Sequence, residues 1–366
     1  MAKISDVAKE AGVSPATVSR TFNESGLLNK DTQSRVLEAA RRLNYNPPRL
    51  RKQMAITNQA SNYDAIHSAV SRTVGFQFFS TGPADTLTNN TFYAEVLEGA
   101  RAEAATLGLE MVINTTDRHQ AAHAIPQLAR EQDLAGLLLV GVVEPQIQAA
   151  FSHYFREIIL VDNRDDMGIT EGIITDGVGG AYAAASYLIG LGHRRIAFLT
   201  AEAEVKTFQD RQRGYASALF EAGIAPERDL VFPVPFTLSH LERKAKIAQF
   251  LQGPNRPTAI VAANDFLAHI TLKVCDELGL RVPDDISVVG FDDIASSHKS
   301  SPPLTTVRVE TEQMGRLAVR RLFARLNDNT GNTGKGSDTG GTSIERRVCT
   351  LVPVSLVVRQ SCRSLC

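Results

Sequence analysis

Residues 6–23 read D-V-A-K-E-A-G-V-S-P-A-T-V-S-R-T-F-N, and this stretch determines how the first fifty residues fold. Up to Gly12, apolar residues recur at the spacing of one helix face, and a glycine suits the left-handed turn that ends a helix. Ser14 and Pro15 then read as an N-cap and a first helical residue, so a second helix is predicted from Pro15 to Asn23. A third periodic segment follows, and the three helices together predict a helix-turn-helix head.

The second predicted helix presents small and polar side chains, which favours close approach to the major groove of DNA. Arg20 has the reach to donate two hydrogen bonds to guanine, an interaction worth about 1–3 kcal/mol of base discrimination. Thr17, Ser19 and Asn23 are side chains of the kind that bind phosphates and position a helix without reading sequence. The predicted DNA-contacting residues of this region are Ser14, Pro15, Ala16, Thr17, Ser19, Arg20 and Asn23.

The charge distribution separates a basic head from an acidic remainder. Residues 1–53 hold ten lysines and arginines against five aspartates and glutamates, a net charge of +5, whereas the whole chain of 366 residues carries −1. This asymmetry is typical of a polyanion-binding module joined to another domain. No apolar run is long enough to span a bilayer, and the first residues, MAKISDVAKE, show no signal-peptide core. We therefore expect a cytoplasmic protein that has no membrane partner.

From Val74 onward, short apolar runs alternate with helical patterns, which predicts parallel β-α-β units. The runs are too numerous for one small sheet, so the expected α/β body has two doubly wound lobes with a ligand cleft at the carboxyl ends of the strands. The phosphate-loop, dinucleotide and nucleophile-elbow motifs are absent from the sequence, and the four cysteines lack metal-binding spacing. We therefore predict a protein that is not an enzyme and binds neither a cofactor nor a metal.

The stretch quoted above, followed by L-N-Y-N-P, resembles the DNA-binding head of the LacI/GalR family of bacterial transcription regulators. In that family a hinge helix follows the head and inserts an apolar side chain into the minor groove. The resemblance places this hinge at residues 47–55, with Met54 as the inserted side chain and Arg49 near phosphates. Two departures are Arg51, where the family has a small residue, and residues 56–73, which form a longer, polar linker.

The body resembles the same family, whose architecture is like that of type I periplasmic binding proteins. The matching motifs are L-I-G-L-G-H-R-R-I-A-F-L (188–199), R-Q-R-G-Y (211–215), V-A-A-N-D (261–265), D-I-S-V-V-G-F-D-D (285–293) and P-P-L-T-T-V (302–307). They follow one another in family order, so the resemblance extends from the head through both lobes.

The resemblance also implies where the domains begin and end, because family chains cross three times between the lobes. The expected domains are a helix-turn-helix head at 1–47, a hinge and linker at 48–73, an effector-binding and dimerisation domain at 74–360, and a loose tail at 361–366. Lobe one is expected to comprise about 74–174 and 308–340, and lobe two about 175–307 and 341–360.

The family's ligand cleft implies a set of candidate effector-binding residues. Arg211 matches the arginine that grips ligand oxygens, Asp292 an acid that accepts hydrogen bonds from hydroxyls, and Phe236 an aromatic ring that stacks on the ligand. The full candidate set is Phe92, Tyr93, Asp176, Arg211, Phe236, Asn264 and Asp292. An arginine, two carboxylates, an amide and aromatic rings favour a sugar or sugar derivative, and a purine base acting as a corepressor stays an alternative.

Together these inferences predict a transcriptional regulator, a repressor, that binds a pseudo-palindromic operator as a homodimer and responds to a small molecule. When bound to DNA it would be associated with the nucleoid. A solute-binding protein would explain the body but neither the basic head nor the missing secretion signal. A dinucleotide-dependent enzyme is disfavoured by the missing phosphate loop.

Overall fold

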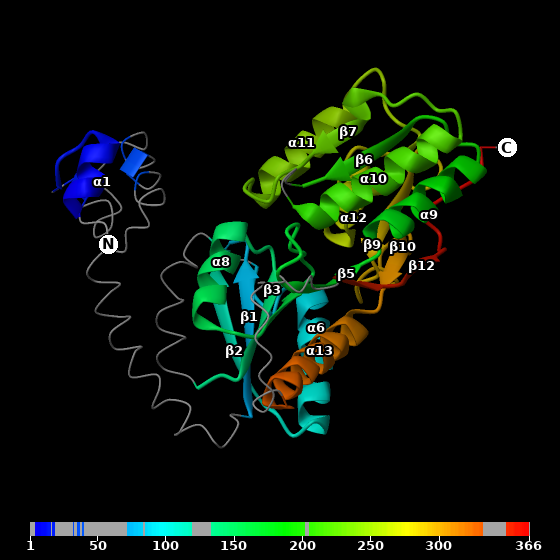
Figure 1. The fold of residues 1–366 in the computed structure, drawn as a ribbon. Helices are drawn as coiled ribbons and strands as arrows, with labels where there is room; N and C mark the ends of the chain where they lie inside the picture. Colours follow the sequence, from blue (N-terminus) through cyan, green and yellow to red (C-terminus); the bar gives the residue numbers. More distant parts are fainter. Residues whose placement is uncertain are drawn as a thin grey trace. The chain divides into compact units, whose positions relative to one another are not determined.

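The computed structural model of the chain forms two compact units, Met1–Val70 and Ser71–Cys366 (Figure 1). The structure describes residues 4–15, 17–18, 32, 35–36, 39, 72–82, 85–118, 133–201, 205–331 and 349–365. Within these ranges no helix is long and apolar enough to cross a membrane, and no cluster of histidine, cysteine or acidic residues is arranged to hold a metal ion.

The first unit begins with helix α1 (Ile4–Ala11), as the apolar period predicts. The helix ends at Gly12, whose φ of +65° confirms the predicted left-handed turn. The hydroxyl of Ser14 accepts a hydrogen bond from the backbone N–H of Thr17 at 3.1 Å, which is the predicted N-cap geometry. The small core of this unit consists of Val7, Ala8, Ala11, Val18, Val36 and Ala39.

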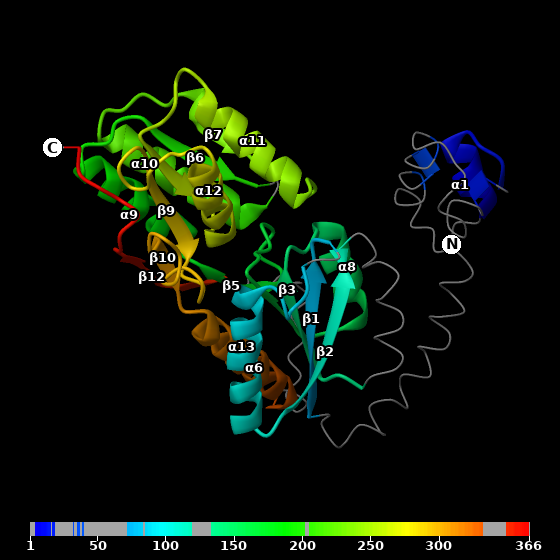
Figure 2. The ribbon, with the colours of Figure 1, turned by 180° about the vertical axis from the view of Figure 1, so that it is seen from behind.

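Lobe one of the second unit is built on a six-stranded sheet in the order β11-β5-β4-β3-β1-β2, and every pairing in it is parallel. The strands are β1 (Thr73–Ser80), β2 (Glu110–Asp117), β3 (Gly136–Gly141), β4 (Ile158–Val161), β5 (Glu171–Thr175) and β11 (Cys349–Val352). The helices among the described residues of this lobe are α6 (Thr91–Thr106), α8 (Pro145–Tyr154) and α13 (Thr311–Gly331), and α6 lies beside α13 in both views (Figures 1 and 2).

Strand alternation distributes apolar side chains to both faces of this sheet. On β3, Leu137 and Leu139 pack with Phe151 of α8, whereas Leu138 and Val140 pack with the core cluster that includes residues of α6 and α13. Both faces are therefore covered, which explains why the strands read as continuous apolar runs rather than as alternating ones.

Lobe two has a second six-stranded sheet in the order β12-β10-β9-β8-β6-β7, parallel except for the β10–β12 pair. Its strands are β6 (Ile196–Thr200), β7 (Val231–Pro233), β8 (Ala259–Ala262), β9 (Ser287–Asp292), β10 (Thr305–Val309) and β12 (Val354–Val357). Its helices are α9 (Gly177–Gly190), α10 (Lys206–Glu221), α11 (His240–Gln252) and α12 (Asp265–Glu277), with a 3-10 turn at Arg228–Leu230. The predicted body of two doubly wound lobes is confirmed.

Glycines allow the helices that carry the pocket residues to pack closely. A Cβ at Gly99 of α6 would overlap the backbone of Glu312 in α13, and one at Gly214 of α10 would overlap the carbonyl of Val178 in α9. These two positions bring α6 against α13 in lobe one and α10 against α9 in lobe two, so each lobe holds its pocket-bearing helix through a backbone contact.

The assignment of residues 341–360 to lobe two is wrong for strand β11. Cys349–Val352 pairs in parallel with β5 of lobe one, with Cys349 opposite Gly172. Only after Pro353 does the chain enter lobe two, where β12 pairs with β10. The pairing satisfies the outer backbone groups of β5, which would otherwise lie at a sheet edge.

The expectation of a loose tail after residue 360 is also wrong. Ser361 is fully buried, and its hydroxyl accepts from the backbone N–H of Thr305 at 2.8 Å and donates to the carbonyl of Val288. Further along, the backbone N–H of Leu365 donates to the carbonyl of Leu191 at 2.8 Å. Residues 361–365 therefore form part of lobe two.

Candidate functional site

A pocket of about 370 Å³ lies between the two lobes at the carboxyl ends of the strands, where the fold predicts a ligand site. Six of the seven candidate effector residues line it, namely Phe92, Tyr93, Arg211, Phe236, Asn264 and Asp292. They come from the start of α6, from α10, from the β7–α11 loop and from the ends of β8 and β9. Residues that are far apart in the chain are therefore brought together at one cleft.

Asp176 is the exception, because the structure places it outside the pocket lining. Its side chain is the N-cap of α9 and accepts a hydrogen bond from the backbone N–H of Gly179 at 2.8 Å. The structure therefore shows a structural contact for Asp176, the satisfaction of an otherwise unpaired N–H at a helix start, and its role in effector binding stays a prediction.

In lobe two, Arg211 and Asp292 form a buried couple. The guanidinium of Arg211 donates to the carbonyl of Ala263 and lies over the ring of Phe291, 3.8 Å from its centroid. One terminal nitrogen lies 3.2 Å from Oδ1 of Asp292, near enough for an ion pair but not aligned for a hydrogen bond. Nε of Arg211 and Oδ1 of Asp292 thus have no hydrogen-bond partner among the described residues.

The electrostatics of this couple are dominated by burial. Burial raises the pKa of Asp292 well above its ordinary value, and the guanidinium of Arg211 opposes that rise. Asp292 also has a φ of +120°, an unusual conformation for a residue with a side chain. Strained backbone of this kind concentrates at functional sites, and here it occurs where β9 delivers a carboxyl group to the pocket.

The neighbouring acid, Asp293, faces elsewhere. Its carboxylate pairs with Arg308 at 2.8 Å and with Arg359 at 2.5 Å, and it does not belong to the pocket lining. Of these two adjacent acids, only Asp292 therefore belongs to the pocket lining.

Lobe one contributes a carboxyl group that the sequence analysis missed, Asp162. It follows β4 directly, has a φ of +58°, and its Oδ2 accepts a hydrogen bond from the hydroxyl of Tyr93 at 2.8 Å. The other oxygen, Oδ1, has no hydrogen-bond partner within the described part of the chain, and burial raises the pKa of this carboxyl group. The available signal was an acid placed immediately after the apolar run I-I-L-V, as Asp292 is placed at the end of β9.

Aromatic rings form the apolar walls of the pocket. Phe92 and Tyr93 of lobe one meet edge to face at 5.1 Å. In lobe two, Phe236 makes similar contacts with Phe208 at 5.9 Å and with Phe266 at 6.0 Å. A ring-shaped ligand between these walls would find an apolar surface on each side.

Asn264 and Arg243 also belong to the polar part of the lining. The amide oxygen of Asn264 accepts from the backbone N–H of Leu267 and caps α12, so its amide N–H groups are what it offers to a ligand. Arg243 donates to the carbonyl of Phe236 at 2.7 Å, and its guanidinium lies 5.3 Å from the ring centroid of Phe266. It therefore holds the lobe-two aromatic wall in place.

The predicted DNA-contacting residues divide into two groups. Ser14 and Pro15 are exposed and Thr17 is half-buried at the start of the second helix of the head. The other predicted contacts lie outside the described residues and stay predictions: Ala16, Ser19, Arg20, Asn23, Arg49 and Met54.

Two family models match the chain. The model of bacterial regulatory proteins of the lacI family matches residues 3–48, and that of a periplasmic binding protein-like domain matches residues 185–362. Among curated relatives, the HTH-type transcriptional repressor PurR of Aliivibrio salmonicida is 30% identical over 331 residues, covering 90% of this chain and 93% of that protein. PurR of Photobacterium profundum is 29% identical over 369 residues and covers 100% of both chains.

Solved structures show the same likeness over the full length. A complex of the transcriptional regulator CelR with cellobiose has a TM-score of 0.72 at 25% identity and covers 99% of this chain and 100% of its own. A lac repressor dimer bound to operator and the anti-inducer ONPF has a TM-score of 0.65 at 27% identity, with 99% of each chain covered.

Proposed function

Because the chain belongs to the lacI family of bacterial regulatory proteins, we propose that the pocket between its lobes controls repression by binding an uncharged, hydroxyl-rich ligand, a sugar or sugar derivative. The chain is a DNA-binding transcriptional repressor with an effector-binding domain, and it binds operator DNA as a homodimer. The pocket geometry supports a neutral, hydroxyl-rich effector, and a ligand screen tests this proposal.

The observation that carries the proposal is a set of open polar atoms from both lobes. Nε of Arg211 is a donor without a hydrogen-bond partner, and Oδ1 of Asp292 is an acceptor that is ion-paired with Arg211 at 3.2 Å but has no aligned hydrogen bond; Oδ1 of Asp162 adds a second acceptor. Each such group costs about 1–3 kcal/mol when it stays unsatisfied. A hydroxyl donates and accepts at once, so a ligand with several hydroxyls satisfies all three atoms.

The balance of ionisable groups favours an uncharged ligand. The pocket lining holds three carboxyl groups, of Asp85, Asp162 and Asp292, and two guanidinium groups, of Arg211 and Arg243, and the guanidinium of Arg211 is already paired with Asp292. Burial raises the pKa of both Asp162 and Asp292, so the site disfavours added negative charge, and a phosphate or carboxylate on the ligand would have to share the guanidinium of Arg211 with Asp292. The aromatic walls meanwhile suit the apolar faces of a sugar ring.

A purine base is the second candidate, and one observation favours it. Tyr93 and Phe236 bring aromatic rings into the pocket from opposite lobes, an arrangement in which a flat base would stack on one ring or on both. The curated relatives are repressors named PurR, which agrees with this alternative.

A thermal-shift screen of the full chain against neutral sugars, sugar acids, sugar phosphates and purine bases separates these candidates. A ligand at a hundred times its Kd stabilises the native state by about 2.7 kcal/mol, so a true effector raises the melting temperature measurably. The proposal expects the largest shift from a neutral sugar, and the shift should be lost in Arg211→Met. A shift from purine bases alone would replace the sugar by a base.

We also propose that the pocket binds its ligand without transforming it, and that the protein acts in the cytoplasm, at the nucleoid when bound to DNA. The supporting relatives are transcription regulators. Mass spectrometry of the ligand after prolonged incubation with the protein tests the first statement, because recovery of a changed ligand would contradict it.

A further inference from the structure

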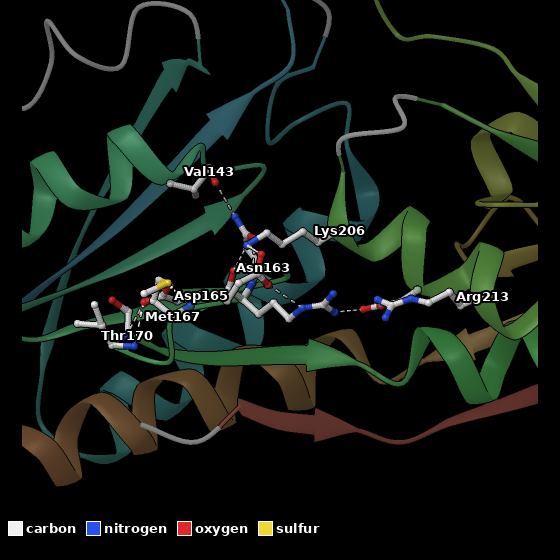
Figure 3. A network of polar contacts seen from close by, with 11 residues as sticks. Val143, Asn163, Asp165, Met167, Thr170, Lys206 and Arg213 are labelled. Atoms are coloured by element: carbon white, nitrogen blue, oxygen red, sulfur yellow. Dashed lines mark hydrogen bonds and ion pairs between the residues drawn. The ribbon is translucent and has the colours of Figure 1, made fainter. Parts of the chain in front are cut away.

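Outside the pocket, the two lobes are joined by an ion pair that the effector site does not include. Arg164, in the loop after β4 of lobe one, donates to the carboxylate of Asp210 on α10 of lobe two. Asp210 also accepts from Arg213, one helix turn further along α10. Figure 3 shows this row of alternating charges crossing from one lobe to the other. The Asp210 carboxylate is buried and shared by two cations, so its pairing with Arg164 is shielded from bulk solvent.

A second ion pair lies beside the first, and in this pair lobe one supplies the acid and lobe two supplies the basic side chain. Lys206, at the start of α10, lies with Nζ 2.9 Å from Oδ2 of Asp166 in lobe one and donates to the carbonyl of Arg164 at 2.8 Å. Asp166 is mostly exposed, unlike Asp210. The lobes are therefore joined by one buried and one exposed ion pair, each with its acid in a different lobe.

In lobe one, the loop that carries Arg164 is stabilised by hydrogen bonds that do not involve lobe two. The carboxylate of Asp165 accepts from the backbone N–H groups of Met167, Ile169 and Thr170 at 2.9–3.0 Å. The side chain of Asn163 donates to the carbonyl of Val143 at 2.9 Å (Figure 3). The loop thus presents Arg164 to α10 without help from a ligand, so little conformational freedom is left for the ion pair to remove.

Residues of the interlobe ion pairs and residues of the pocket are close neighbours on the same two segments, the loop after β4 and helix α10. Asp162, a pocket residue, is two positions before Arg164. On α10, Arg211 lines the pocket directly after Asp210, and Thr207 lines it directly after Lys206. None of the four ion-pairing residues belongs to the pocket lining. A movement of the lobes that separates Arg164 from Asp210 therefore also moves Asp162 of lobe one away from Arg211 of lobe two.

We propose that Arg164–Asp210, supported by Lys206–Asp166, is an interlobe latch that holds the two halves of the pocket in register before a ligand binds. These four residues act as positioning residues, because they set the separation between Asp162 and Arg211 rather than contacting the ligand. The latch favours the closed arrangement in the ligand-free protein. The consequence for operator release rests on the proposed function, whereas the latch itself is a statement about the body alone.

Distances between the lobes test the latch without any effector or DNA. Spin labels are attached to cysteines introduced at Tyr154 of α8 and Phe220 of α10, both exposed, in a full chain whose native cysteines are replaced. Pulsed electron paramagnetic resonance then gives the distribution of distances between the labels. The labelled chain is mixed with an excess of unlabelled chain, so that most labelled homodimers carry both labels in one subunit. For the otherwise unchanged chain we then expect one dominant peak, and for Arg164→Met a shift toward longer distances with a broader distribution.

Further variants distinguish a latch from a local stabilising contact. Lys206→Met should give a smaller shift, because its pair is exposed and weaker. The control Arg101→Met, which breaks an exposed pair with Glu98 inside α6, should leave the distribution unchanged. The double variant Arg164→Met with Asp210→Asn restores charge balance and should stay open.

Two results would overturn the proposal. The first is a distance distribution for Arg164→Met that superimposes on that of the parent protein, even if its melting temperature falls. The second is closure of the double variant, which would mean that the single variant opens only because Asp210 is left with an uncompensated charge.

Discussion

The two lobes differ in what they leave open for a ligand. Lobe two presents Arg211 and Asp292 as a couple with both an unpaired donor and an unpaired acceptor. Lobe one presents Asp162, one of whose oxygens already accepts from the hydroxyl of Tyr93 at 2.8 Å. Of these three side chains, the couple in lobe two offers a ligand both a donor and an acceptor, whereas Asp162 in lobe one offers an acceptor. We therefore infer that the ligand binds first to lobe two and that lobe one then encloses it.

The change with the largest expected effect is Arg211→Met, which removes the donor of the anchoring lobe. We expect affinity for the ligand found in the thermal screen to fall by about 1.5–3 kcal/mol, roughly ten- to a hundredfold, because hydrogen bonds to charged groups contribute that much. Isothermal titration calorimetry measures the change, with Arg101→Met as the matched control at an exposed arginine. Full affinity in Arg211→Met would exclude this residue from the site.

The pocket carboxyls also predict how stability depends on pH in the ligand-free protein. Burial raises the pKa of Asp292 well above its ordinary value of 3.8, so the native state retains this proton longer than the unfolded state. The group therefore contributes stability below about pH 4 and loses it as the pH rises toward the native pKa.

Asparagine does not ionise, so Asp292→Asn should be more stable than the parent protein at pH 7, with the difference vanishing below about pH 4. Asp162→Asn should show the same trend, because burial also raises the pKa of its carboxyl group. Urea denaturation at several pH values measures both variants. A stabilisation that is independent of pH would contradict the assignment to these carboxyl groups.

Asp162→Asn tests how much lobe one contributes to ligand affinity. The substitution keeps the size of the side chain and weakens one acceptor, so we expect ligand affinity to fall by about 1 kcal/mol, roughly fivefold. The measurement is the same calorimetric titration as for Arg211→Met, performed with the same ligand. A larger loss in Asp162→Asn than in Arg211→Met would reverse the proposed order, with lobe one as the anchor.

The same comparison explains what the sequence could predict. In lobe two the pocket residues stand in extended family motifs, R-Q-R-G-Y and G-F-D-D, so the amino-acid sequence is sufficient to assign Arg211 and Asp292 to the cleft. Asp162 follows a short apolar run with no motif around it, and its importance comes from contact with Tyr93, 69 positions away. The position of Asp162 after that run was the available signal, but contacts across such separations leave no local pattern, so neither its contact with Tyr93 nor the interlobe pair of Arg164 with Asp210 could be predicted.

The errors in the fold have a similar origin. The apolar residues of β11 indicate a strand, but the partner of that strand is decided by the free edge of β5, which lies far earlier in the chain. The tail from Ser361 to Leu365 lacks regular periodicity, yet its backbone and hydroxyl groups satisfy Val288, Thr305 and Leu191. Segments of this kind are positioned by hydrogen-bonding partners that only the folded sheet supplies.

The smallest expected effect tests the one candidate residue that the structure separates from the pocket. Asp176→Ala removes the N-cap of α9 and should lower the free energy of unfolding by about 0.5–2 kcal/mol, measured by urea denaturation. Ligand affinity should stay within experimental error of that of the parent protein, because the carboxylate bonds to Gly179 rather than facing the pocket. Asp176→Ser, which retains a capping oxygen, should recover most of the lost stability. A loss of affinity in both variants at unchanged stability would return Asp176 to the effector site, and the anchoring lobe would then hold a second acid beside Asp292.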